Sequence, residues 1–185
     1  MPGRDQKTIE VLATALSRLE GNLGRTKLIK LAYLSDYFAR KTIGRPITSY
    51  TYRFGDHGPF DRAFYDTLEV LGGEGVQERR YEEWDAYRYT VPAPLAEARA
   101  LDSTERHIVE SVIEKFGRLP LRQLLDFVYS TEPMISAEPG AELRMDVVNG
   151  SIARETGLDF DTYLASRAAL REGDRIPIED LIDAL

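Results

Sequence analysis

Apolar residues recur with helical spacing along the first 40 positions of the chain. In residues 5–20 they fall three or four positions apart, which predicts an amphipathic helix that ends at Gly21-Asn22. Residues 26–40 are apolar almost all round, and a helix of that kind packs against neighbours on several sides. We therefore expect the second helix to be the central one. Its apolar positions are Leu28, Ile29, Leu31, Ala32, Leu34 and Phe38.

The period of the pattern shortens after Gly44-Arg45-Pro46, a sequence that breaks helices. Residues 47–54 predict a strand, because Tyr50, Tyr52 and Phe54 place aromatic side chains at every second position. Residues 55–59 have the composition of a turn and end in a proline, which suits the first position of a helix. Residues 60–71 return to helical spacing, so we expect a third helix that closes at Gly72-Gly73.

Two runs within residues 76–91 alternate like the strands of a hairpin. Beyond them the apolar spacing predicts one helix at residues 103–116 and another that opens at Pro120. The sequence around Pro133 ends this second helix, because the residue before a proline disfavours helical backbone. These elements predict a mainly α-helical α+β fold, a compact helical domain with a small β-hairpin.

The composition changes near residue 140. Residues 140–185 hold ten acidic and five basic side chains, and the apolar pattern there supports only one helix, near 159–172. We therefore expect a domain at residues 1–140, followed by an acidic C-terminal extension at 141–185 that is packed on it or partly mobile.

The chain has an ordinary soluble composition, with 43% hydrophobic and 30% charged residues. It contains no cysteine, which excludes disulfides and thiolate chemistry and fits a reducing compartment. Its first residues lack the apolar core of a signal peptide, and no window approaches the ~18 apolar residues of a membrane helix. The sequence therefore predicts a cytoplasmic protein without membrane association.

Charge is distributed unevenly along the chain, whose net charge is −7. Residues 1–54 hold ten Lys and Arg against four Asp and Glu, a net of +6, so the remainder carries −13. One interpretation is a basic face that touches an acidic partner, either protein or nucleic acid. The other is that solvated helix faces simply differ in charge.

Catalytic and metal-binding patterns are missing from the sequence. Neither of the two histidines, His57 and His107, has a second histidine three or four residues away, as in the His pairs of helical metal sites. No serine stands in a Gly-x-Ser-x-Gly context, and Gly72-Gly73-Glu74-Gly75 is not followed by the Lys-Ser or Lys-Thr of a phosphate loop. We therefore expect no enzyme activity, no cofactor and no metal.

Polar side chains form one stripe on the predicted central helix. Lys30, Tyr33 and Tyr37 stand three and four residues apart and share one side of the helix, with Asp36 beside them. Such a stripe is either a satisfied polar seam in the core or the lining of a groove that receives a partner segment. Aromatic and arginine side chains dominate binding energy at protein interfaces. The predicted partner-binding residues are Lys30, Tyr33, Tyr37, Tyr52, Arg53, Asp56 and His57.

The helices at 103–116 and from Pro120 have the length of a helix-turn-helix, and the hairpin at 76–91 has arginines suited to a wing. A recognition helix presents Lys, Arg, Asn or Gln to the DNA groove, and this one offers only Arg122, Gln123 and Asp126 before Tyr129. A DNA-binding transcriptional regulator is therefore the alternative function.

Three segments carry a family resemblance. KLIKLAYLSDY at residues 27–37 resembles the K-L-x-K-L-x-Y-x-x-D helix of the SocA-like, or Panacea, antitoxin domain family. YRFGDHGPF at 52–60 is similar to that family's aromatic-x-x-G-P turn, lengthened by Asp56-His57, and YSTEPM at 129–134 resembles its T-H-x-E-x-P-W element. In the last segment Ser130-Thr131 replaces the usual Thr-His pair and Met134 the usual Trp.

The resemblance implies a mostly helical domain of bacterial and phage-associated proteins that acts as an antitoxin by binding a toxin directly. It also implies that some members deliver the toxin to a ClpX-type protease as proteolytic adaptors, and it carries over no catalytic residues. The function predicted from the sequence is therefore a non-enzymatic antitoxin of a bacterial or phage toxin-antitoxin system, whose partner is a cognate protein toxin.

Overall fold

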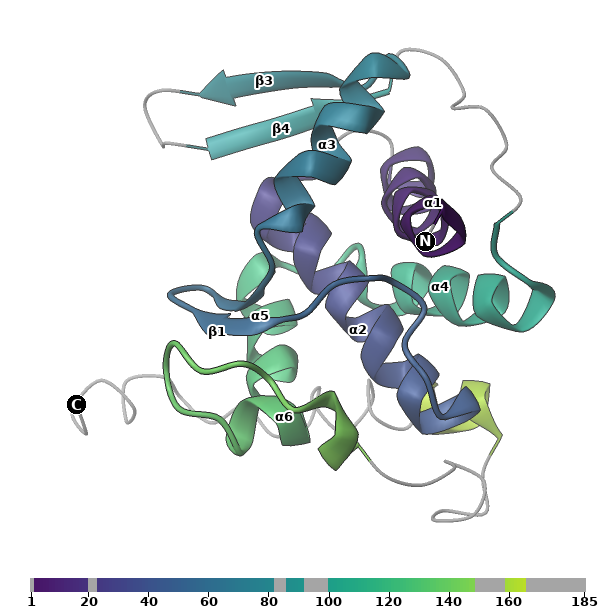
Figure 1. Ribbon diagram of the computed structural model, residues 1–185, viewed down its shortest axis with the longest axis vertical. Coiled ribbons are helices and arrows are strands. Elements are labelled where there is room, and N and C mark those ends of the chain that lie inside the picture. The colour runs from purple at the N-terminus through teal and green to yellow at the C-terminus, as the bar shows by residue number, and fades with distance from the viewer. Residues whose placement is uncertain (1, 20–22, 82–85, 92–99, 149–158, 166–185) are drawn as a thin grey trace.

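Helix α2 (Arg25–Ile43) crosses the middle of the molecule, and the other helices pack around it (Figure 1). Its apolar side chains are buried, and Leu28 and Phe38 are fully covered. The prediction of a central second helix is therefore confirmed. The helix ends at Gly44, which takes a positive φ of 75° and donates its N–H to the carbonyl oxygen of Arg40.

The computed structural model describes residues 2–19, 23–81, 86–91, 100–148 and 159–165. Most of the predicted acidic extension therefore lies outside the described residues. None of the described helices combines the length and the apolar character that crossing a membrane requires.

Three helices enclose α2, namely α1 (Pro2–Arg18), α4 (Ser103–Phe116) and α5 (Leu121–Tyr129). Where α2, α4 and α5 meet, the rings of Phe38, Phe116 and Phe127 pack with centroids 4.7 to 6.0 Å apart. Helix α4 begins with a capping box, in which Asp102 and Glu105 each accept the other's backbone N–H. The predicted helices at 103–116 and after Pro120 are confirmed.

The predicted strand at residues 47–54 is mostly wrong. Only its end forms strand β1 (Arg53–Gly55), which pairs antiparallel with β2 (Gly58–Phe60). The first two residues of the predicted strand have no strand neighbour, because the buried carboxylate of Asp36 accepts their backbone N–H groups. The aromatic alternation there reflects burial of side chains in the core and not a sheet.

The predicted third helix begins later than its proline suggested. Pro59 lies opposite Phe54 in the β1–β2 ladder, and helix α3 (Ala63–Gly73) starts four residues after it. The segment 55–59, predicted as a turn, is therefore the tip of a short hairpin together with the end of β1 and the start of β2.

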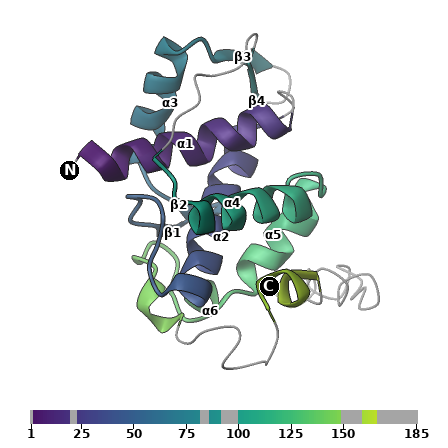
Figure 2. The ribbon, with the colours of Figure 1, turned by 90° about the vertical axis from the view of Figure 1, so that its right-hand side faces the viewer.

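The predicted second hairpin is confirmed as β3 (Gln77–Tyr81) and β4 (Ala86–Thr90), with Gln77 opposite Thr90 and Tyr81 opposite Ala86. It lies at one end of the molecule, and α6 (Glu132–Ile135) lies at the other (Figures 1 and 2). An isolated antiparallel bridge joins Leu23 to Tyr89 and ties β4 to the start of α2.

The chain beyond residue 140 contributes to the core. A single 3-10 turn (Met145–Val147) follows Leu143, and residues 160–165 are helical, within the span where a helix was predicted. Leu143, Val148 and Leu164 are buried, and the ring centroid of Phe160 lies 5.9 Å from that of Phe38. The described part of the extension is thus held by apolar contacts.

Candidate functional site

The polar stripe of α2 is inside the protein. The exposed fraction is 1% for Lys30, 0% for Tyr33 and 3% for Tyr37, and Tyr52, which faces them, is 1% exposed. A partner cannot touch these four side chains in this conformation. The structure therefore favours the polar-seam interpretation over the groove for these residues, and we call Lys30, Tyr33 and Tyr37 the polar seam.

The first residue of the polar seam holds the β1–β2 hairpin. Lys30 donates from Nζ to the carbonyl oxygen of Pro59 at 2.7 Å. Burial disfavours the charged ammonium and lowers its pKa from 10.5 to about 7. Gly58 takes a φ of 85° directly over this lysine, and a Cβ there would lie 3.4 Å from Lys30 Cε. The lysine and the Gly-Pro turn of the family resemblance are therefore in direct contact.

The other two residues of the seam hold the turn between α5 and α6. The hydroxyls of Tyr33 and Thr131 are hydrogen-bonded at 2.7 Å, and Tyr37 donates to Glu132 Oε2 at 2.6 Å. Lys41 Nζ donates to the other oxygen of Glu132 at 2.7 Å. Burial would raise the pKa of the Glu132 carboxyl, but the Lys41 ammonium and the Tyr37 hydroxyl outweigh it, so the pKa lies below its ordinary value.

Asp36, beside the seam, anchors the segment that was predicted as a strand. It accepts the backbone N–H groups of Ile47 at 2.7 Å and Thr48 at 2.8 Å. The hydroxyls of Thr48 and Tyr52 also donate to it, the latter at 2.8 Å. Complete burial raises the pKa of this carboxyl although all four hydrogen bonds favour its charged form. An acidic residue on an otherwise apolar helix is the feature of the sequence from which this anchor could have been predicted.

Lys27 belongs to the same sequence segment and closes α4. It donates from Nζ to the carbonyl oxygens of Gly117 at 3.1 Å and Leu119 at 2.7 Å. A cation at a helix C-terminus stabilises the last carbonyl groups and the negative end of the helix dipole. Lys27, like the polar seam, therefore has a structural partner inside the chain.

Three of the predicted partner-binding residues are exposed, namely Arg53, Asp56 and His57. Arg53 donates to the carbonyl oxygen of Gly140 at 2.9 Å. Asp56 and His57 form the exposed tip of the hairpin, between the paired residues Gly55 and Gly58. These two lie apart from the buried polar seam, so the structure divides the predicted set into a buried and an exposed group.

An exposed tyrosine lies beside the hairpin tip. Tyr129 on α5 is 37% exposed, and its ring centroid is 5.9 Å from that of Phe54 on β1. Partial burial and the nearby carboxylate of Asp56 raise the pKa of the Tyr129 hydroxyl. We call Phe54, Asp56, His57 and Tyr129 the tip surface. Tyr129 was missed as a site residue because its exposure depends on how α5 packs.

The excess positive charge of residues 1–54 is largely neutralised by ion pairs within the chain. Ion pairs join Lys7 to Glu105 at 2.7 Å, Arg18 to Glu110 at 2.6 Å, Arg25 to Glu78 at 2.6 Å, Lys41 to Glu132 at 2.7 Å and Arg45 to Glu105 at 2.6 Å. Every acidic partner in these pairs comes from the acidic remainder of the chain. The charge asymmetry along the sequence therefore does not produce an unneutralised basic face over these residues.

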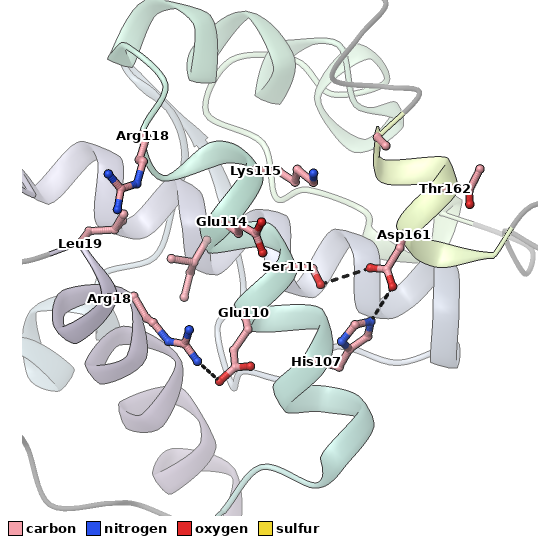
Figure 3. Close-up of a pocket in the computed structure, with 12 residues that line it drawn as sticks. Arg18, Leu19, His107, Glu110, Ser111, Glu114, Lys115, Arg118, Asp161 and Thr162 are labelled. Carbon is pink, nitrogen blue, oxygen red and sulfur yellow. Dashed lines mark hydrogen bonds and ion pairs between the residues drawn. The ribbon is translucent and has the colours of Figure 1, made fainter.

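A groove of about 740 Å³ runs along α4 toward the helical residues 160–165 (Figure 3). In it Asp161 accepts from Ser111 at 3.4 Å and lies 3.2 Å from His107 Nε2. A nucleophilic triad needs the histidine between the serine and the acid, and here the acid is in the middle. These residues therefore lack the order that activates a serine. Within the described residues no three His, Asp or Glu side chains are placed to hold a metal.

Comparison with known proteins gives a family match. The family model described as the antitoxin SocA-like, Panacea domain matches residues 28–133, more than half of the chain. No curated protein and no solved structure matches. The matched span runs from α2 to α6 and contains the contacts of Lys30, Tyr33 and Tyr37 described above.

Proposed function

Because the chain belongs to the antitoxin SocA-like, Panacea domain family, we propose that it neutralises a protein toxin by binding it directly. The mechanism is stoichiometric, in that the bound antitoxin covers the toxin's active surface, and it requires no catalytic group on this chain. The family match to residues 28–133 is the observation that carries the proposal.

The tip surface is the proposed place of contact. It joins two exposed polar side chains, Asp56 and His57, to the exposed ring of Tyr129. Tyrosine is one of the residue types that contribute most to binding energy at protein interfaces. The hairpin beneath it is fixed by the bond from Lys30 to Pro59, so the surface is ordered before a partner arrives.

Co-expression with the product of the neighbouring small reading frame tests this function. We expect rescue of growth together with co-purification of a stoichiometric complex. Tyr129→Ala combined with His57→Ala should weaken the complex without unfolding the protein. Val70→Ala, at an exposed apolar position on α3, is the matched control and should leave the complex unchanged. Toxicity that persists with no complex formed would reject direct neutralisation.

A proteolytic adaptor role toward a ClpX-type protease is a second part of the proposal, and its support is the family resemblance. The test is the half-life of the purified toxin in the presence of the protease, with and without this chain. Faster degradation with the chain present supports the adaptor role. An unchanged half-life limits the proposal to neutralisation by binding.

DNA binding, the alternative function, gains no support from helix α5. Its exposed residues include Arg122, Gln123 and Asp126 together with the apolar Leu121 and Tyr129. A helix that reads the major groove presents several hydrogen-bond donors to base edges and phosphates. The exposed carboxylate of Asp126 would be repelled by the phosphates. We therefore do not propose this function.

A further inference from the structure

The β3–β4 hairpin has one side that packs on the protein. The guanidinium of Arg25 stacks on the ring of Tyr87, with its Cζ 3.4 Å from the ring centroid, and bonds to Glu78 and to the hydroxyl of Tyr89. Together with the bridge from Leu23 to Tyr89, these contacts attach this side to the start of α2. The alternation of strand side chains then directs the neighbouring positions to solvent.

The solvent side carries two arginines that face each other. Arg79 and Arg88 are exact partners in the strand register, and both are exposed. Their guanidinium carbons lie 5.1 Å and 5.7 Å from the centroid of the Tyr81 ring. Like charges directly opposite each other destabilise a strand pair. We call Arg79, Tyr81 and Arg88 the arginine face.

This pair contrasts with the basic residues near the N-terminus. Those residues meet carboxylates in the same chain, whereas neither Arg79 nor Arg88 has an ion pair within the part of the chain that the structure describes. The contrast is notable in a protein of net charge −7, where acids outnumber bases. Two guanidinium groups held on one aromatic ring, with no ion pair to another described residue, provide planar donors suited to carboxylates.

The sheet also offers a place for an extended chain. The sheet contains only β3 and β4 among the described strands, and the bridge from Leu23 occupies the β4 side at Tyr89. The other edge, that of β3, has no strand neighbour in the described residues. A peptide can add to such an edge through its backbone while its side chains reach the neighbouring face.

We propose that the β3–β4 hairpin binds an acidic, extended segment of a partner protein, whose carboxylates pair with Arg79 and Arg88 while its backbone adds to β3. This surface is separate from the tip surface and lies at the other end of α2 from α6 (Figure 1). A protein segment fits better than duplex DNA, because a net charge of −7 repels a long polyanion more than a short acidic strand.

The test uses the full chain and fluorescein-labelled peptides, with binding read by anisotropy. One peptide alternates Glu and Val, a second alternates Lys and Val, and a labelled DNA duplex is the third probe. We expect the Glu peptide to bind and the Lys peptide not to. The double variant Arg79→Gln, Arg88→Gln should weaken Glu-peptide binding at least about tenfold, because two charge-assisted pairs are lost.

A matched double variant controls for net charge. Arg118→Gln with Arg122→Gln removes two exposed arginines outside the hairpin and should leave Glu-peptide binding unchanged. The melting temperature of the Arg79, Arg88 variant should stay level or rise, because the substitutions remove a repulsion. Peptide-induced shifts of backbone amide signals should centre on β3.

Three results would overturn the proposal. Equal affinity of the wild type and the Arg79, Arg88 variant would show that the arginine face does not bind the peptide. Equal binding of the Lys peptide would remove the role of charge. Tighter binding of the DNA duplex than of the Glu peptide, lost in the same variant, would assign the face to nucleic acid. Because no toxin is used, failure here leaves the antitoxin test standing.

Discussion

Tyr37 donates its hydroxyl hydrogen to Glu132 at 2.6 Å, although 95 positions separate the two residues in the sequence. Each lies in a segment that carries the family resemblance, and so do Lys30 and Pro59, which are also hydrogen-bonded. The segments from which a partner-binding surface was predicted therefore contact each other inside the protein. In this chain the residues of the polar seam hold elements of the fold together, and they are buried.

Tyr37→Phe should destabilise the fold by about 1–2 kcal/mol, because it leaves Glu132 without one of its two donors. Urea unfolding followed by circular dichroism measures the change. Tyr65→Phe is the control, since Tyr65 is 47% exposed and its hydroxyl has no hydrogen bond in the described structure. Equal stability of the two variants would show that the Tyr37 bond contributes nothing.

Asp36→Ala should cost about 3–5 kcal/mol, because it leaves buried N–H and hydroxyl donors without an acceptor. That loss is a large part of the ~5–15 kcal/mol by which domains are usually stable. We expect a much lower melting temperature and loss of near-ultraviolet dichroism from Tyr52. Asp66→Ala, at an exposed position, should change stability by less than about 0.5 kcal/mol. A similar loss in both variants would contradict the role of Asp36.

Lys30 should make stability increase with pH between about 7 and 9.5. Burial lowers its pKa from 10.5 to about 7 in the folded protein, so in this range the unfolded chain binds more protons. Stability then rises with pH, by up to about 1.4 kcal/mol per unit. Above this range tyrosine ionisation in the unfolded chain opposes the trend.

Lys30→Met isolates this effect, because it keeps the length of the side chain and removes the titrating group. Urea unfolding at several pH values should give a flatter profile for the variant than for the wild type. If both proteins show the same slope over pH 7 to 9.5, another group is responsible for the dependence. The variant also lacks the hydrogen bond to Pro59 at every pH. This loss lowers its stability by a similar amount throughout and does not change the slope.

Gly117→Ala should destabilise the fold by about 1–3 kcal/mol through overpacking. The added Cβ would lie 2.5 Å from the carbonyl oxygen of Ile113 and 2.5 Å from Leu19 Cδ1. Gly72→Ala is the control and should change stability in the opposite direction. Nothing lies within 4 Å of the Cβ that would be added, and alanine favours helix α3. We expect the control to stabilise by about 0.5–1 kcal/mol. Thermal melting distinguishes the two, and stabilisation by both would refute the close packing at Gly117.

The candidate site was only partly predictable. The hairpin tip, with Asp56 and His57, could be found from the sequence because short polar turns between apolar elements reach the surface. Tyr129 and the pairing of Arg79 with Arg88 could not. The exposure of Tyr129 depends on which side of α5 meets the core, and the facing of the arginines depends on strand register.

The sequence by itself determined the elements whose signals are local. Helical spacing defined α2, the Asp102 and Glu105 side chains fixed the start of α4, and alternation located the β3–β4 hairpin. These features depend on neighbours a few residues away, so a short window of sequence contains their cause.

Only the tertiary structure decided whether polar and aromatic side chains face water or the core. Residues 47–52 alternate like a strand, yet the backbone N–H groups of the first two bind a carboxylate from α2 and not a neighbouring strand. Lys30 and Tyr37 resemble a binding stripe, yet partners 29 and 95 residues away bury them. Burial of a polar group depends on whether a distant partner satisfies it, and that partner is supplied by packing of the whole chain.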